Sequence, residues 1–426
     1  MTPRRRRARR LASLAIALLA TVTLAAPGGG AEAATKVTVA MHYHSGQQKI
    51  LERLFEEYER ANPDVDLVYQ QISYRDYLQT ILTARMGGQR PDVYHLYSPW
   101  GGKMVQGRAL AAPPAEIKAL IEREFVQSAR DAVAIAGEVW GPPTEVSNYL
   151  LVYNKAHLAE AGINAPPATW DELVKAAVAV TRKDEAGRTT RAGFGFGETP
   201  ARVAHTFLAH LYSNGGRLLT DDGKTGVASE QAVATLEQAV ALARSGATDP
   251  ALTGVNTENG TVAMAMRASW TRANFREVMG PDFGQKIGVA PIPAGSDWRT
   301  VAYAFFHAVD ARSPVKDEAW KLIAWLNTPR EGGKGSPMGE VLADLGALTG
   351  SRADLAAYPE VYADPFTKPF VDALERSVPE PTHPATREME AALQRAVEKA
   401  LRGEATARDA LTTAAAEIDD LLAQSE

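Results

Sequence analysis

An alternation of strand and helix periods near the start of the chain constrains the fold more than any other feature. Val37, Val39 and Met41 occupy every second position and predict a strand, and apolar residues at 50–58 then recur at helical spacing. The same two periods return over 65–69 and 77–86, and a third strand begins near Val93. Strands that alternate with helices form a parallel sheet with helices on its faces, so the sequence predicts an α/β fold.

Two short patterns are typical of helix N-termini. Ser45 stands three residues before Gln48, and Thr169 stands three residues before Glu172. In such a capping box the hydroxyl accepts a hydrogen bond from the backbone three residues on, and the longer side chain reaches back. We therefore expect one helix to begin after Ser45 and another after Thr169.

Residues 140–173 carry the most specific motif in the chain. A Gly-Pro-Pro loop leads into an apolar strand that ends Tyr153-Asn154-Lys155, and Pro-x-Thr-Trp-Asp-Glu-Leu follows at 167–173. This order closely resembles the family 1 extracellular solute-binding proteins of ABC importers, the maltose-binding-protein-like group. Gly-x-x-Pro-Asp-Val at 88–93 and the segments 260–270 and 289–295 extend the resemblance over nearly the whole chain after its N-terminal segment.

Four residues, at three places in the chain, depart from the family pattern. Ala268 replaces a glycine, Ala302-Tyr303 stand where the family often has two glycines, and Thr349 replaces a proline. From the resemblance we expect a helix before Trp270. Tyr303 would place a phenol where the floor of the ligand cleft is expected.

The resemblance implies the type II periplasmic-binding-protein fold, in which two discontinuous α/β lobes enclose an interlobe ligand cleft. By analogy, lobe 1 comprises 34–146 plus 306–346 and lobe 2 comprises 147–305 plus 347–426. Three crossovers are expected near 145–150, 303–307 and 345–351. Hinge closure around a ligand is the motion that such an arrangement predicts.

Residues 1–33 have the features of a secretory signal peptide. Six arginines lie in 4–10, an apolar segment covers 11–26, and Ala31-Glu32-Ala33 fits a cleavage site. A membrane anchor is the alternative, but the apolar segment is shorter than the ~20 residues of a membrane span. The arginine pair at 9–10 leaves Sec and twin-arginine export both open. Since the chain has no cysteine, it cannot carry a lipid-modified N-terminal cysteine, and a periplasmic location is expected.

The charge of the mature chain argues against nucleic acid or an anionic membrane as a partner. Removal of six arginines and Glu32 changes the formal net charge from −5 to −10. The length of 426 residues allows two domains after the signal peptide.

Ligands of open α/β sheets bind beyond the carboxyl ends of the strands. The residues that follow the first and third predicted strands are Tyr43, His44, Ser45, Ser98 and Trp100. These five are therefore candidate ligand-binding residues. Ser45 also begins a helix, whose free N–H groups suit a hydroxyl or a phosphate.

Carbohydrate recognition requires flat apolar surfaces and planar polar groups. Trp100 and Trp270 match cleft aromatics in the family, and Tyr303 joins them as a candidate, although each could instead pack inside a lobe. Glu145 and Asn148 lie on the first expected crossover, where an ionised carboxylate accepts and an amide both donates and accepts. A solvated hinge is the alternative for these two.

Metal-binding and catalytic motifs are weak. His42 and His44 stand two residues apart, but no third ligand follows at a suitable spacing and neither His95 nor His307 is evidently near, so no metal site is predicted. A glycosidase needs two carboxyl groups at a defined separation. Nothing in the sequence fixes the separation of Glu145 and Asp92, so this pair does not predict a hydrolase. Walker, HExxH, Gly-x-Ser-x-Gly and Rossmann motifs are missing, and neither an enzyme nor a cofactor is expected.

The resemblance thus implies a monomeric periplasmic binding protein that passes a carbohydrate, either an oligosaccharide or a modified sugar, to an inner-membrane ABC permease. Glycerol 3-phosphate or a related phosphorylated solute is the alternative, because His44 and Ser45 at a helix N-terminus would suit phosphate. A secreted glycan hydrolase is the alternative of another class.

Overall fold

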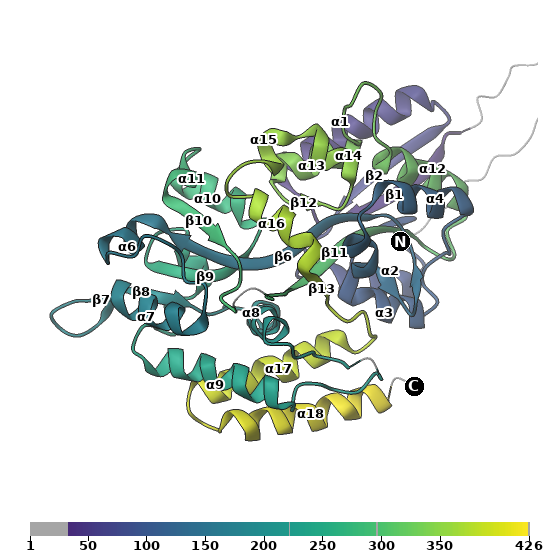
Figure 1. Cartoon of the computed structure of the whole chain (residues 1–426). Coiled ribbons are helices and arrows are strands. Elements are labelled where there is room, and N and C mark those ends of the chain that lie inside the picture. Colours follow the sequence, from purple (N-terminus) through teal and green to yellow (C-terminus); the bar gives the residue numbers. More distant parts are fainter. Residues whose placement is uncertain (1–32, 221, 295–296, 425–426) are drawn as a thin grey trace, which may run out of the picture.

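The computed structural model describes residues 33–220, 222–294 and 297–424 (Figure 1). The region predicted as a signal peptide, 1–33, lies almost wholly outside them. Within the described residues, one 11-stranded sheet has the central order β2-β1-β3-β11-β6-β9-β8-β7. Helices cover it, which confirms the α/β class. Among the described residues, no helix is both long and apolar enough to cross a membrane.

The strands are β1 (Thr35–Met41), β2 (Val65–Gln71), β3 (Val93–Tyr97), β4 (Ala134–Ile135), β5 (Glu138–Val139), β6 (Pro143–Asn154), β7 (Arg182–Lys183), β8 (Thr189–Gly195), β9 (Val262–Ala268), β10 (Ile287–Ala290), β11 (Thr300–Val309), β12 (Leu348–Thr349) and β13 (Ser377–Pro379). The helices are α1 (Ser45–Ala61), α2 (Tyr77–Met86), α3 (Ser98–Gln106), α4 (Ala115–Glu124), α5 (Gln127–Ala132), α6 (Lys155–Glu160), α7 (Trp170–Val180), α8 (Pro200–Ser213), α9 (Glu230–Arg244), α10 (Thr271–Met279), α11 (Phe283–Lys286), α12 (Lys316–Asn327), α13 (Pro337–Leu345), α14 (Arg352–Ala357), α15 (Pro359–Tyr362), α16 (Lys368–Asp372), α17 (Thr386–Leu401) and α18 (Ala407–Ala423), with short 3₁₀ turns η1 (Gly254–Thr257) and η2 (Ala373–Arg376).

The N-terminal alternation forms as predicted. β1 pairs in parallel with β2 on one side and with β3 on the other. α1, α12 and α13 bury apolar side chains against this end of the sheet, in a core that includes Val37, Leu51, Ile323 and Val341. Burial of this apolar face fixes the helices on the sheet.

Two long strands pass through the middle of the sheet. β11 pairs with β3 from Phe305 to Val309, and its other half pairs with β6 at Ala302 and Tyr303. β6 then continues beyond β11 and pairs with β9. β12 pairs with β6 at Glu145. The three segments expected as crossovers therefore meet on β6, which runs across the centre of Figure 1.

The predicted helix before Trp270 is wrong. Residues 262–268 form strand β9, and every one of them is buried between β6 and β8. A short apolar run buried on both faces has no polar positions to reveal its period, so periodicity does not distinguish strand from helix there.

One of the two capping boxes is also wrong. His44 holds the extended N-cap backbone without a side-chain cap, and Ser45 has a φ of 53°, in the left-handed region. Gln48 bonds along the helix to Glu52 instead. By contrast, the capping box of Thr169 and Glu172 is confirmed in full at the start of α7.

Candidate functional site

Two aromatic residues singled out from the sequence contact each other. Trp270 lies two residues after the end of β9, is partly exposed, and donates from Nε1 to Tyr303 Oη at 3.1 Å. Tyr303 lies on β11 opposite Ser147 of β6 and is buried. Burial raises the pKa of Tyr303 to about 12, so its hydroxyl stays protonated at neutral pH and can both donate and accept. A flat indole and a neutral phenol thus lie together in the middle of the sheet.

Tyr303 connects to side chains that the sequence did not single out. Its ring stacks on the His205 imidazole of α8 with 4.9 Å between centroids, and the Tyr97 ring meets it edge-on at 5.0 Å. Tyr97 Oη donates to Glu380 Oε2 at 3.1 Å. We name the group Tyr97, Tyr149, His205, Tyr303, Glu380 and Glu390 the convergent cluster; all six are buried.

The acids of the convergent cluster lie in a strongly desolvated environment. Burial raises the pKa of Glu380, and burial and then the charge of Glu380 raise the pKa of Glu390 well above its ordinary value. Burial also lowers the pKa of His205 to about 4, so its imidazole is neutral at pH 7. The convergent cluster therefore contains several hydrogen-bond acceptors but no positively charged side chain.

A pocket opens beside Trp270, with about 230 Å³ of empty space. Tyr149, Thr206, Met266 and main-chain atoms around Gly197 and Gly254 contribute to its wall. Guanidinium groups lie over the Trp270 ring, that of Arg202 at 4.8 Å and that of Arg267 at 5.8 Å from the ring centroid. These are cation–π distances, and they hold the indole in place.

Each of these arginines also has an acidic partner. Arg202 pairs with Glu198, and Arg267 pairs with Glu258 at 2.5 Å. Burial lowers the pKa of Arg267 to about 10, and the guanidinium remains charged at neutral pH. The wall of the pocket thus combines an aromatic face with paired charges.

Trp100 lies in α3, which follows β3 directly. It is buried, and its ring stacks with Tyr77 at 5.7 Å and with the more exposed Tyr74 at 5.2 Å. Its edge meets Tyr97 at 5.3 Å. Ser98 Oγ accepts from the backbone N–H of Ala304 at 3.1 Å and so ties β3 to β11. Trp100 therefore borders the convergent cluster, and Ser98 supports the strand that carries Tyr303.

Tyr43 and Glu145 form a second buried contact. Tyr43 Oη donates to Glu145 Oε2 at 3.3 Å, and burial raises the pKa of Glu145 to about 7. Asn148 donates to the Phe370 carbonyl oxygen at 3.0 Å and to Ser377 Oγ at 3.2 Å. Both crossover residues are thus buried and hydrogen-bonded, and neither is a solvated hinge residue.

His44 and Ser45 lie apart from these contacts. Both are exposed, and His44 Nδ1 lies 3.0 Å from Ser45 Oγ. Helix α1, which begins here, contacts α13, where Gln47 donates to Asp344 Oδ2 at 2.9 Å. Within the described part of the chain, neither residue shares a hydrogen bond with Trp270 or Tyr303.

The comparison with protein families decides the class of the chain. The sequence pattern of the family described as "Bacterial extracellular solute-binding protein" matches residues 44–332. The chain belongs to this family.

Relatives and solved structures agree with this assignment. A binding protein of Brucella abortus (strain 2308) is 27% identical over 320 residues, which cover 72% of this chain and 76% of that protein. The maltotriose-binding protein of Pyrococcus abyssi (strain GE5 / Orsay) is 24% identical over 379 residues, 86% of this chain and 78% of that one. The GacH receptor of Streptomyces glaucescens, solved unliganded and with acarbose, has a TM-score of 0.78 at 22% identity and covers 93% of this chain and 100% of its own. At that identity the likeness is one of fold, and it confirms the two-lobed α/β class.

In this solute-binding protein, sequence reasoning missed His205, Glu380 and Glu390. His205 and Glu390 each lie beside the apolar face of a helix in the sequence. A polar residue at such a place is often buried, and this was the signal that could have identified them. In the sequence neither His95 nor His307 was evidently near His42, but the fold places His95 next to both of them. The His95 ring lies 5.2 Å from that of His42 and 5.1 Å from that of His307, because β3 lies between β1 and β11.

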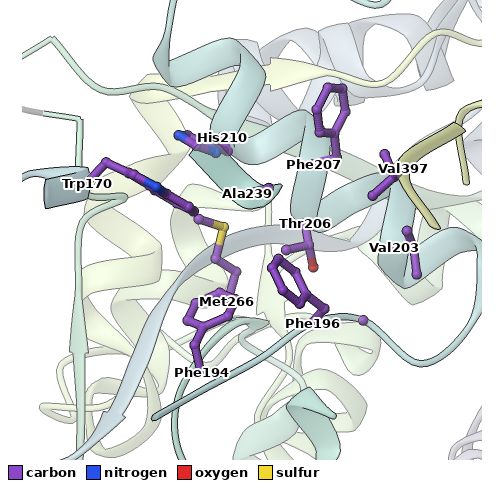
Figure 2. A pocket seen from close by; sticks show the side chains of 11 residues that line it. Trp170, Phe194, Phe196, Val203, Thr206, Phe207, His210, Ala239, Met266 and Val397 are labelled. Carbon is purple, nitrogen blue, oxygen red and sulfur yellow. The ribbon is translucent and has the colours of Figure 1, made fainter. Parts of the chain in front are cut away.

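Figure 2 shows a second, apolar pocket of the solute-binding protein, with about 360 Å³ of empty space. Trp170 of the Pro-x-Thr-Trp motif stacks on His210 with 3.7 Å between centroids and donates to the Gln238 carbonyl oxygen at 3.2 Å. This pocket shares Thr206 and Met266 with the pocket beside Trp270. The family tryptophan therefore packs α7 against α8, immediately behind the candidate site.

Proposed function

We propose that this protein is the periplasmic solute-binding component of an ABC importer and that it captures a carbohydrate, an oligosaccharide or a modified sugar, for an inner-membrane permease. Membership of the solute-binding family supports the transport role. The names of relatives that bind maltotriose and arabinooligosaccharides, and a similarly folded receptor solved with acarbose, support the sugar class.

The observation that carries the proposal is the contact between Trp270 and Tyr303. A partly exposed indole offers an apolar face to the C–H side of a pyranose, while the phenol beside it donates and accepts. Its neighbour Tyr97 and the acids Glu380 and Glu390 add acceptors for hydroxyl groups. A site of this composition suits a polyhydroxylated ring better than an apolar solute.

We propose contact roles for the other candidates according to their positions. Trp100 would extend the aromatic wall, and Tyr43 with Glu145 would lie on the lobe 1 side of the crossovers. Asn148 and Ser98 would hold the strands that carry these groups, since their polar atoms bond within the protein.

A thermal-shift screen of the purified protein tests the proposal. Mono-, di- and trisaccharides form one arm and glycerol phosphates the other. A ligand at a hundred times its dissociation constant stabilises the native state by ~2.7 kcal/mol, a clear rise in Tm. Shifts from sugars support the proposal, and shifts confined to phosphates contradict the sugar class.

A phosphorylated solute is the second candidate, because two guanidinium groups lie over Trp270. Salt distinguishes the two: affinity for a phosphate falls as ionic strength rises, whereas affinity for a neutral sugar barely changes. Turnover of chromogenic glycosides by the wild type, abolished in Glu145→Gln, would instead establish a hydrolase and overturn the binding role.

A further inference from the structure

Three metal-ligating side chains converge inside the molecule from distant parts of the chain. They are His205 of α8, Glu380 directly after β13 and Glu390 of α17. His205 Nε2 lies 3.0 Å from Glu380 Oε2 and 3.9 Å from Glu390 Oε1. One ligand atom from each residue lies within 4.8 Å of the other two. One nitrogen and two carboxylate oxygens thus face a common point.

The carboxylates are incompletely paired. Among the described residues, neither Glu380 Oε1 nor Glu390 Oε1 has a hydrogen-bond partner, although the two residues are only 2% and 5% exposed. Glu390 Oε1 is the atom that faces His205 Nε2. Two buried carboxylates in contact are unfavourable unless a cation or a shared proton lies between them. The cluster therefore needs either a cation or a shared proton between the two acids.

The imidazole is arranged as a neutral ligand. His205 Nδ1 lies 3.2 Å from Tyr149 Oη, a hydroxyl oxygen that can accept a hydrogen bond from Nδ1–H. With the proton on Nδ1, the lone pair of Nε2 faces the two acids and also Tyr97 Oη, which lies 3.2 Å away. A ligating histidine that donates its other N–H to a fixed oxygen is the usual outer-shell arrangement of protein metal sites. Tyr97 Oη, which donates to Glu380 Oε2, fixes that carboxylate in the same way.

The spacing fits an ion better than an ammonium group. Ligand atoms at about 2.0–2.2 Å from a tetrahedral metal lie roughly 3.3–3.6 Å apart. The separations of 3.0 and 3.9 Å from His205 Nε2 bracket that range. Three acceptors of one ammonium group, each at about 2.9 Å from its nitrogen, would lie roughly 4.7 Å apart. The two distances from His205 Nε2 are therefore closer to those between the ligands of one metal ion than to those between the acceptors of one ammonium group.

We propose that His205, Glu380 and Glu390 bind a divalent transition-metal ion of the Zn²⁺ class. This set of one imidazole and two carboxylates is one that Zn²⁺ accepts, with a further position left for water or a solute oxygen. Tyr303 stacks on the His205 ring, so the ion lies next to the proposed solute contacts. The inference does not depend on the identity of the solute, because metal binding is measured without one.

Calorimetric titration of the chelator-treated protein with Zn²⁺ tests the proposal. We expect one ion per chain, and we expect Glu390→Gln, Glu380→Gln and His205→Gln each to weaken binding by at least about 100-fold. Glu388→Gln is the matched control on the same helix; Glu388 is exposed and pairs at 3.6 Å with Lys103. Its zinc affinity should equal that of the wild type.

Thermal unfolding shows whether a variant that no longer binds Zn²⁺ is still folded. Without metal, Glu390→Gln should melt at or above the wild-type temperature, because a neutral isostere relieves the carboxylate contact. With Zn²⁺, the wild type should rise in Tm and Glu390→Gln should not. The proposal would be overturned if the wild type failed to bind Zn²⁺ at submillimolar concentration, or if Glu390→Gln bound it equally well. A shared proton would then lie between the two acids in place of a metal ion. Neither result changes how the thermal-shift screen with sugars is interpreted.

Discussion

Glu145 shows how burial changes the chemistry of a single crossover residue. The pKa of Glu145 is raised to about 7 from 4.5, chiefly by burial, while the bond from Tyr43 partly opposes the shift. Between pH 4.5 and 7 the native protein therefore holds a proton that the unfolded chain has released. The free energy of unfolding falls as pH rises through this range and stops falling above it.

We predict that Glu145→Gln removes this contribution. The loss of stability between pH 5 and pH 8, measured by urea unfolding, should shrink by up to about 3 kcal/mol, since one pKa unit corresponds to about 1.4 kcal/mol. The amide of the variant keeps an oxygen acceptor for Tyr43. The exposed Glu388→Gln is the control, and an unchanged pH dependence in Glu145→Gln would show that Glu145 is solvated in solution.

Trp270→Ala should weaken solute binding by about 1–3 kcal/mol with little change in Tm, because the indole is partly exposed and its loss removes contact area. Tyr303→Phe is the matched variant, since it removes the acceptor of the indole N–H and keeps the ring. A lower Tm with unchanged affinity in Trp270→Ala would assign Trp270 to the core.

At the scale of single residues, the sequence identified candidate site residues better than it identified the residues that they contact. The motif at 260–270 and the departure at Tyr303 pointed to two side chains that are bonded to each other. His205 and Glu380 are separated by 175 residues, and only the assembled fold brings them to 3.0 Å. Spacing within a sequence carries no information on such a contact.

Among the elements, local rules held where the interactions are local. The capping box of α7 is formed within four residues, so Thr169 and Glu172 were predicted correctly. At Ser45 the left-handed backbone at the strand–helix turn displaces the cap, and in β9 burial on both faces hides the strand period. In both cases tertiary structure overrides local preference.

We predict that Thr169→Ala destabilises the protein by about 1 kcal/mol, because the N–H of Glu172 then loses its intramolecular acceptor. Urea unfolding measures the loss. Thr169→Ser should recover most of it, since serine caps as well as threonine does. Equal losses in the alanine and serine variants would mean that packing of the threonine methyl group, and not the cap, stabilises α7.

For the whole molecule, the sequence predicted the alternation of elements but not the strand order. The order β3-β11-β6-β9 joins strands that are distant in the chain, and it results from pairings that no local period encodes. The family resemblance supplied the crossovers near 145–150, 303–307 and 345–351, and these segments do meet on β6. The division into lobes at these segments, with a hinge between them, remains our proposal.

The burial of the candidate site supports the proposed hinge. Tyr303 is 7% exposed and Glu145 is 5% exposed, so a solute reaches neither unless the lobes separate. We therefore predict that a solute from the thermal-shift screen makes the protein more compact, with a smaller radius of gyration in small-angle X-ray scattering. Trp270→Ala should reach the same compact state only at higher solute concentration, because the variant lowers affinity without blocking closure. A solute that raises Tm strongly and leaves the scattering curve unchanged would mean that the site is rigid and that solute enters through the pocket beside Trp270.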